Sequence, residues 1–187
     1  MRLALSAALS VGLFGLMQPA AACAQLSANV WMCDRGTIWE NARWDTEGDG
    51  NTRFLGRIIF NFTEEWPGFD IGLDDSTLEE QFATYAEWIA ADGGSPVEVL
   101  QVDQIETDHA TALRHLQRDR VDGDDTMSAV MLAQVSDARI MLYLDGPAHT
   151  PLKEIEAVSR QVAELLRDHC ADAVSCASDT SAKVATE

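Results

Sequence analysis

The chain has 187 residues, of which 47% are hydrophobic, and its 31 acidic residues outnumber 13 lysines and arginines to give a formal net charge of −18. Apolar content near one half excludes intrinsic disorder and is enough for one sizeable core, so this length predicts a single folded domain. The acidic excess argues against a nucleic-acid or anionic-membrane partner, because both need a basic protein face.

The first residues have the pattern of a secretory signal. One early arginine precedes an uncharged apolar run that is too short to span a bilayer comfortably. Small residues stand at positions −3 and −1 for cleavage after Ala24 or after Ala22, and we prefer Ala24, which assigns residues 1–24 to the signal. A lipoprotein signal that acylates Cys23 is the alternative, although Ala20 replaces the leucine usual at that point.

Export places the cysteines in an oxidising compartment, periplasmic or secreted, where disulfide pairing is expected. The preferred pair is Cys33 with Cys170, because both lie at element boundaries and a bond would tie the two ends of the domain together. Pairing of Cys170 with Cys176 is the alternative, and Cys23 is available as a partner only after cleavage at Ala22. No later apolar run is long enough for a transmembrane segment in the mature protein.

The first predicted element pair is a β-hairpin. Residues 36–44 and 53–62 are rich in β-branched and aromatic side chains, and the turn-forming run 45–52 separates them. Trp39 and Trp44 differ by an odd number of positions, so on one strand they point to opposite faces and cannot enter the same core. Whichever of the two is exposed is our first candidate for a partner contact.

Two amphipathic helices are predicted further along the chain. The first spans residues 76–92, where Ser76 and Glu79 match a capping box and two glycines follow the last apolar position. The second begins with Thr150 as N-cap and proline at the first helical position, and it should end near Cys170.

Between these helices, short polar turns divide four apolar stretches, which predicts an antiparallel meander. The stretches are residues 97–105, 110–120, 126–134 and 139–144. The order hairpin, helix, four-stranded meander and helix predicts an α+β fold in which helices pack on an antiparallel β-sheet. We expect one domain over residues 25–172 and a disordered tail over residues 173–187.

This element order resembles the PsbP-like α/β/α sandwich family. The resemblance covers residues 37–169 and rests on the capped helix 76–92, the strand-turn-strand 110–134 and the closing helix 151–170. Members of that family act mostly as docking or accessory modules without catalysis. The resemblance therefore implies a binding role.

Motifs for common enzyme chemistry are absent from the sequence. It has no G-x-S-x-G, P-loop, G-x-G-x-x-G or H-E-x-x-H pattern, so we expect no cofactor. His109 and His115 would share one face of a regular strand but stand about 20 Å apart, too far to bind one metal. A hydrolase that uses carboxylates or one of these histidines is the alternative function.

A second alternative is a calcium-binding module. Asp45, Glu47 and Asp49 offer oxygen ligands at alternate positions before a glycine, as in the first half of an EF-hand loop. The second half is missing, because Arg53 occupies the ninth position and Gly56 replaces the bidentate glutamate. We therefore favour a hairpin turn.

These observations favour an exported, non-catalytic binding or accessory module of the bacterial cell envelope, with a protein partner. A pocket lined by two facing carboxylates would instead favour a hydrolase, whereas an apolar groove would favour binding.

Overall fold

The computed structural model of the chain describes residues 23–45, 51–63, 65–66, 69–70, 76–91, 97–121 and 123–169. These residues form two α-helices, one short 3-10 helix and three β-sheets.

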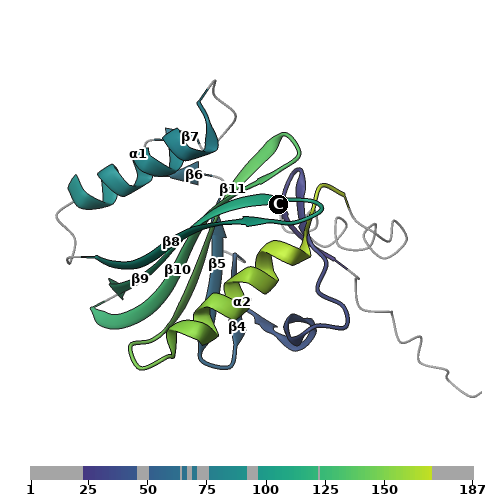
Figure 1. Cartoon of the computed structure of the whole chain (residues 1–187). Coiled ribbons are helices and arrows are strands. Elements are labelled where there is room, and N and C mark those ends of the chain that lie inside the picture. The colour runs from purple at the N-terminus through teal and green to yellow at the C-terminus, as the bar shows by residue number, and fades with distance from the viewer. Residues whose placement is uncertain are drawn as a thin grey trace, which may run out of the picture.

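A seven-stranded antiparallel sheet forms the centre of the molecule (Figure 1), with the strand order β3-β4-β5-β11-β10-β9-β8. Its strands are β3 (Arg43–Trp44), β4 (Thr52–Leu55), β5 (Ile58–Thr63), β8 (Glu98–Glu106), β9 (Thr111–Val121), β10 (Asp124–Val135) and β11 (Ala138–Pro147). The predicted α+β class is confirmed, and β8 to β11 lie where the sequence predicted the meander. Consecutive strands pair with their neighbours because short turns join them.

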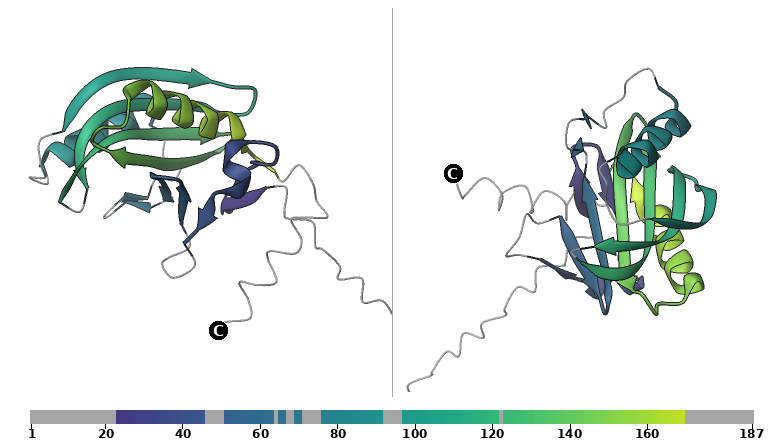
Figure 2. Two further views of the ribbon diagram at one scale, coloured as in Figure 1. Left: turned by 90° about the horizontal axis from the view of Figure 1, so that it is seen from below. Right: turned by 90° about the vertical axis from the view of Figure 1, so that its left-hand side faces the viewer.

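Helices α1 (Leu78–Ala91) and α2 (Leu152–Leu165) pack on opposite faces of this sheet. Val130 and Leu132 of β10 join the apolar cluster under α1, whereas Ala129 and Met131 join the larger core under α2. Successive strand residues point to opposite faces, so one strand supplies both clusters. Figure 2 shows the sheet curving around α2, which packs over β9, β10 and β11.

Two smaller sheets complete the fold. Strands β1 (Ala24–Ser27), β2 (Val30–Met32) and β12 (Leu166–Arg167) form the first, in the order β1-β2-β12, and β6 (Glu65–Trp66) pairs with β7 (Phe69–Asp70) in the second. Because β12 follows α2 directly and pairs with β2, the end of α2 lies beside the N-terminal strands.

The predicted hairpin differs from the structure in both arms. Residues 38–41 form a 3-10 helix, η1 (Ile38–Asn41), in which the Thr37 hydroxyl accepts a hydrogen bond from the Trp39 N–H at 3.1 Å. The stretch 53–62 contains a turn at Gly56, whose φ of 61° glycine adopts without steric penalty, so it forms β4 and β5. The N-terminal third therefore contributes three strands to the sheet.

Both helices begin differently from the prediction. Thr77 caps α1, since its hydroxyl accepts from the Glu80 N–H at 3.2 Å and the Glu80 carboxylate accepts from the Thr77 N–H at 2.9 Å. The capping box is thus shifted by one residue. Pro151 is the N-cap of α2 and makes no side-chain cap bond, and α2 ends at Leu165, before Cys170, because the chain turns into β12.

A buried arginine joins α2 to the sheet. Arg114 of β9 is fully buried, and its guanidinium donates to both oxygens of Asp103 on β8, at 2.8 and 2.5 Å. It also donates to the Glu156 carbonyl and to the Ser159 hydroxyl of α2, each at 2.8 Å. These bonds satisfy a charged group that would otherwise be unpaired in the core.

Candidate functional site

A row of side chains crosses the α1 face of the sheet near one end of the strands. Strand register places one residue from each of five neighbouring strands in this row, namely Val99, Gln117, Ser128, Asp145 and Ile59. Paired residues of antiparallel strands share a face, so the five side chains lie side by side. We call this set the cross-strand row; it is polar in the middle and apolar at both ends.

Hydrogen bonds organise the polar middle of the row. The Ser128 hydroxyl donates to the Asp145 carboxylate at 2.6 Å and lies 3.0 Å from the Thr126 hydroxyl. On the neighbouring strand, the Gln117 amide donates to the Asp119 carboxylate at 3.1 Å. Gln117 and Ser128 are buried, whereas the two aspartates are partly exposed. The row thus presents carboxylate oxygens on a fixed, hydrogen-bonded base.

Tyr85 of α1 lies close enough to this row to interact electrostatically with Asp119 and Asp145. Burial raises the pKa of the Tyr85 phenol, and Tyr143 and these two carboxylates raise it further. The phenol therefore remains neutral at physiological pH.

The two histidines do not share a strand. His115 lies on β9, with its ring 4.5 Å from that of Phe82, and burial lowers its pKa below the ordinary value. His109 lies in the turn before β9, where its N–H donates to the Thr107 hydroxyl. The spacing considered for the two histidines on one regular strand therefore does not apply, because the strand begins only at Thr111.

A cavity of about 410 Å³ adjoins the row at the ends of the strands. It is lined by Glu98, Arg118, Asp119, Arg120, Asp125, Thr126 and Ala148. Arg118 pairs with Glu98 at 2.8 Å and Arg120 pairs with Asp125 at 3.1 Å. Two of its three carboxylates are thus neutralised by guanidinium groups, unlike the facing acid and base pair that hydrolysis by carboxylates requires.

Exposed apolar side chains lie at both ends of the cross-strand row. Val99 and Val102 of β8 are 47% and 62% exposed, and Ile59 of β5 is 40% exposed. Val102 lies opposite His115 and therefore on the same face as the row. The fourth large exposed hydrophobic side chain of the described chain is Ile38, 52% exposed on η1. Three of the four thus gather on one face.

The tryptophans predicted as contact candidates are not both available. Trp39 is fully buried and packs edge-on against Phe60, with ring centroids 5.5 Å apart, so it is a core residue. Trp44 on β3 is partly buried, and the Arg53 guanidinium stacks over its ring at 4.5 Å. The parity argument assumed one strand, whereas Trp39 lies on η1 and only Trp44 lies on a strand.

Of the three predicted calcium ligands, Asp45 alone lies among the described residues. The Asp45 N–H donates to the Thr52 carbonyl at 2.8 Å and extends the β3–β4 pairing, while Glu47 and Asp49 lie outside the described residues. Within the described ranges, no group of three or more potential metal ligands comes together.

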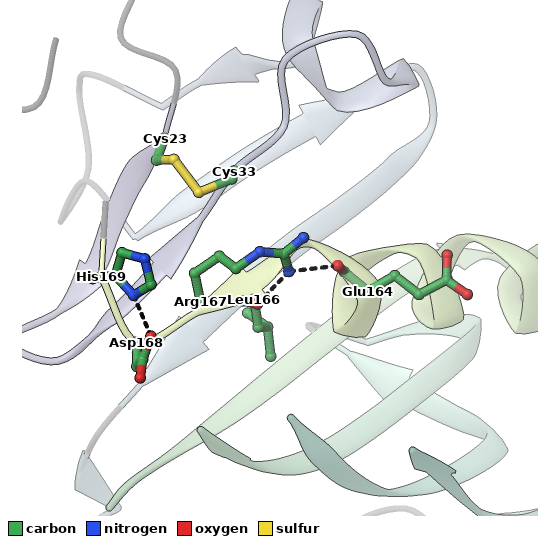
Figure 3. The surroundings of a disulfide bond; sticks show 7 residues. All are labelled: Cys23, Cys33, Glu164, Leu166, Arg167, Asp168 and His169. Carbon is green, nitrogen blue, oxygen red and sulfur yellow. Dashed lines mark hydrogen bonds and ion pairs between the residues drawn. A yellow bond between two sulfur atoms is a disulfide. The ribbon is translucent and has the colours of Figure 1, made fainter. Parts of the chain in front are cut away.

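The disulfide prediction was wrong in its partner. Cys33 is bonded to Cys23, not to Cys170, which lies outside the described residues (Figure 3). The cause is strand register: Ala24 pairs with Met32, so the next residue outward on each strand is a cysteine and the two stand opposite each other. The fold therefore includes Cys23 and Ala24, two residues that the preferred signal boundary would remove.

Sequence reasoning missed the cross-strand row and its apolar flanks. Val99 and Val102 were assigned to a strand, but the sequence did not show that this strand would end the sheet. The available signal was that Ser128, Val130 and Leu132 alternate along β10 with the residues that enter the core under α2, since this second face changes from polar to apolar along the strand.

Comparisons with known proteins identify only distant structural similarity. No protein-family model and no curated protein sequence matches the chain. A Pseudomonas aeruginosa protein of unknown function, PA94, is similar with a TM-score of 0.42 and 13% identity, over 57% of this chain and 68% of that one. The Saccharomyces cerevisiae Ran-binding protein Mog1p is similar with a TM-score of 0.38 and 17% identity, over 78% of this chain and 80% of that one.

A mutant of Mog1 gives a TM-score of 0.37 and 16% identity over the same shares of the two chains. These similarities are too distant to assign a function. Among the described residues, no helix is long and apolar enough to cross a membrane.

Proposed function

We propose that the chain is an exported, non-catalytic binding module of the bacterial cell envelope, and that it presents β8 and the cross-strand row to a protein partner. The observation that carries this proposal is the exposure of Val99 and Val102 on the last strand of the sheet.

The edge position of β8 supports a contact there. β8 is nine residues long, pairs with β9, and ends the seven-stranded sheet. Long edge strands carrying exposed apolar side chains invite pairing with other chains, and proteins normally shorten, charge or cover them. Val99 lies opposite Gln117, whose amide donates to the partly exposed carboxylate of Asp119 on the neighbouring strand β9. Such a mixture of apolar and polar groups is typical of a protein contact surface.

The hydrogen bonds of the row favour binding over hydrolysis. A serine nucleophile needs a base that is itself held in place, and such a base is usually histidine. Here the Ser128 hydroxyl donates to Asp145, while the ring of His115 packs against Phe82. These contacts favour a fixed surface rather than a nucleophile and base pair.

The disulfide between Cys23 and Cys33 supports export, since structural disulfides persist in oxidising compartments such as the periplasm. The PsbP-like resemblance remains part of the proposal. It is supported by α1 and α2 packing on opposite faces of the antiparallel sheet, which gives three layers.

Photo-crosslinking in the cell envelope tests the proposal. A photoreactive residue at Val102 should give one crosslinked partner, and the Val99→Asp substitution in the same chain should abolish that product. The matched control places the photoreactive residue at Ile38, which is similarly exposed but lies on η1. Equal crosslinking from both positions, or a product that survives Val99→Asp, would show that β8 is not the contact surface.

A further inference from the structure

The position of Cys23 in the fold determines how the N-terminus must be processed. We infer that the leader is cut between Ala22 and Cys23, and that Cys23 enters the mature chain as one half of the Cys23–Cys33 disulfide rather than as a lipid anchor. This inference rests on the export part of the proposed function.

Cys23 is a buried, disulfide-bonded residue of the fold. Cys23 is 2% exposed and bonded to Cys33, and β1 begins with the next residue. Cleavage after Ala24 would remove Cys23 together with the first pair of the β1–β2 ladder, Ala24 with Met32. A cut after Ala22 instead retains both residues, and with them the disulfide and the first pair of the ladder.

The number of cysteines left after cleavage also favours a cut after Ala22. Cleavage after Ala24 leaves three cysteines, one of which must remain a thiol or bond to another molecule, whereas cleavage after Ala22 leaves four. Ala22 and Ala20 supply the small residues that this cut requires at positions −1 and −3. The small residues at positions −1 and −3 and the even number of remaining cysteines therefore both favour cleavage after Ala22.

A lipidated Cys23 could not form the disulfide that the structure shows. Acylation of a lipoprotein forms a thioether at the sulfur of its N-terminal cysteine, and a sulfur in a thioether cannot also form a disulfide. Lipidation would therefore deprive Cys33 of the partner that it has in the structure. A bonded Cys23 anchors β1 to β2, and β2 in turn pairs with β12 at the end of α2 (Figure 3).

Two reactions produce this N-terminus. Hydrolysis of the Ala22–Cys23 peptide bond consumes one water and leaves a carboxylate on Ala22 and an amine on Cys23. Thiol–disulfide exchange then joins the two Sγ atoms: both S–H bonds break, and two electrons and two protons pass to a disulfide oxidoreductase of the compartment, which becomes a dithiol.

Processing variants test the site of the cut. The full chain is expressed in a bacterial host that exports it, and the ratio of cleaved to uncleaved protein is measured for each variant. We expect Ala20→Glu to block cleavage, because it places a charge at −3 of the Ala22 site, and its matched control Ala24→Glu to leave cleavage intact. Cys23→Ser should also be cut, since an ordinary signal peptidase does not require cysteine. Blocked cleavage of Cys23→Ser would identify a lipoprotein, and blocked cleavage of Ala24→Glu alone would identify the Ala24 site; either overturns the inference.

Mass spectrometry of the wild-type protein tests the bond. After alkylation without reduction, we expect an N-terminus at Cys23 and a linked pair of peptides carrying Cys23 and Cys33. A start at Gln25, a diacylglyceryl group on Cys23, or an alkylated Cys33 overturns the inference while leaving export intact. An uncut chain that remains in the cytosol overturns both the inference and the proposed export.

Discussion

Arg114 shows that a charged residue can belong to the core when each nitrogen of its guanidinium is hydrogen-bonded. Its guanidinium meets Asp103 on the adjacent strand and two acceptors on α2, so it fixes the helix on the sheet. Asp103 is itself partly exposed, and hydrogen bonds from Arg114 hold the pKa of that carboxyl below its usual value. Arg114 is fully buried whereas Asp103 is partly exposed, so loss of the carboxylate charge leaves a buried cation without its counter-charge.

We expect Asp103→Asn to lower the free energy of unfolding at pH 7 by about 3 kcal/mol, because it leaves the buried Arg114 without its counter-charge. The matched control is Asp125→Asn in the exposed Arg120–Asp125 pair, which should lose at most about 1 kcal/mol. Urea unfolding of the three proteins measures both differences.

The pH dependence of the Asp103→Asn effect has a definite sign. A lowered carboxyl pKa stabilises the fold above the unfolded pKa, near about 4, and this stabilisation is lost as pH falls through the folded value. The difference in the free energy of unfolding between wild type and Asp103→Asn should therefore be largest at pH 7 and decrease below about pH 4. A gap that stays constant down to pH 2 would contradict the assigned ion pair.

Residue identity alone did not reveal which polar residues are internal. The sequence marks Arg53 and Arg114 only as positions in strand-like stretches, yet both are buried and each pairs with an aspartate, Asp34 and Asp103 respectively. These partners lie on other elements, so they become visible only when the elements are assembled. For the same reason Trp39 could not be placed, because its burial depends on Phe60 of β5.

At the scale of elements, the Thr77 cap sets where α1 begins. Thr77→Ala should lower the free energy of unfolding by about 1 kcal/mol, because it leaves the Glu80 N–H without its acceptor. Ser76→Ala is the control suggested by the sequence and should have a smaller effect, since the Ser76 carbonyl that accepts from Arg139 is retained. Thermal melting of both variants decides between the two caps, and a larger loss from Ser76→Ala would contradict the observed one.

Periodicity predicted the existence of most elements, while their ends depended on single hydrogen bonds. The alternation over residues 97–144 predicted β8 to β11 well, because these strands are bounded by short turns such as Ser136-Asp137, where Ser136 has a φ of 55°. The start of α1 was ambiguous since both Ser76 and Thr77 are followed three residues later by glutamate. The end of α2 was extended too far because its sequence does not show that β12 pairs with β2.

The β3–β4 hairpin also determines how calcium should act. Arg53, which stands at the ninth position of the calcium-like run, points inward to Asp34 at 2.6 Å, and the backbone of Asp45 belongs to the hairpin. We expect millimolar CaCl₂ to leave the melting temperature equal to that in MgCl₂ at the same concentration. A site filled to 100 times its Kd would add about 2.7 kcal/mol, so a calcium-specific rise would disprove the turn interpretation.

At the scale of the whole molecule, the strand that follows α2 pairs with the N-terminal strand β2. The Cys33–Cys170 bond expected from the sequence would have tied the two ends of the domain together. In the structure these parts meet instead through the pairing of β12 with β2 and through the Cys33 N–H, which donates to the Leu165 carbonyl at 2.9 Å. The covalent bond was assigned to the wrong partner because Cys33 and Cys170 both lie at element boundaries and the preferred signal boundary left Cys23 out of the mature chain. Register within one small sheet, which sequence patterns do not specify, decided the disulfide.

The net charge of −18 leads to a prediction for the molecule as a whole. Like charges spread over one domain repel each other in the folded state, and dissolved salt screens this long-range repulsion. Buried ion pairs such as Arg53–Asp34 are in direct contact, so salt screens their attraction only a little. Raising NaCl from 10 to 150 mM shortens the Debye length from about 30 to about 8 Å and should therefore stabilise the fold. A gain of about 1 kcal/mol would raise Tm by about 2 to 4 °C, which calorimetry detects. Tetramethylammonium chloride is the control and should act equally, because screening does not depend on the cation; a fall in Tm with salt would mean that surface ion pairs outweigh the net repulsion.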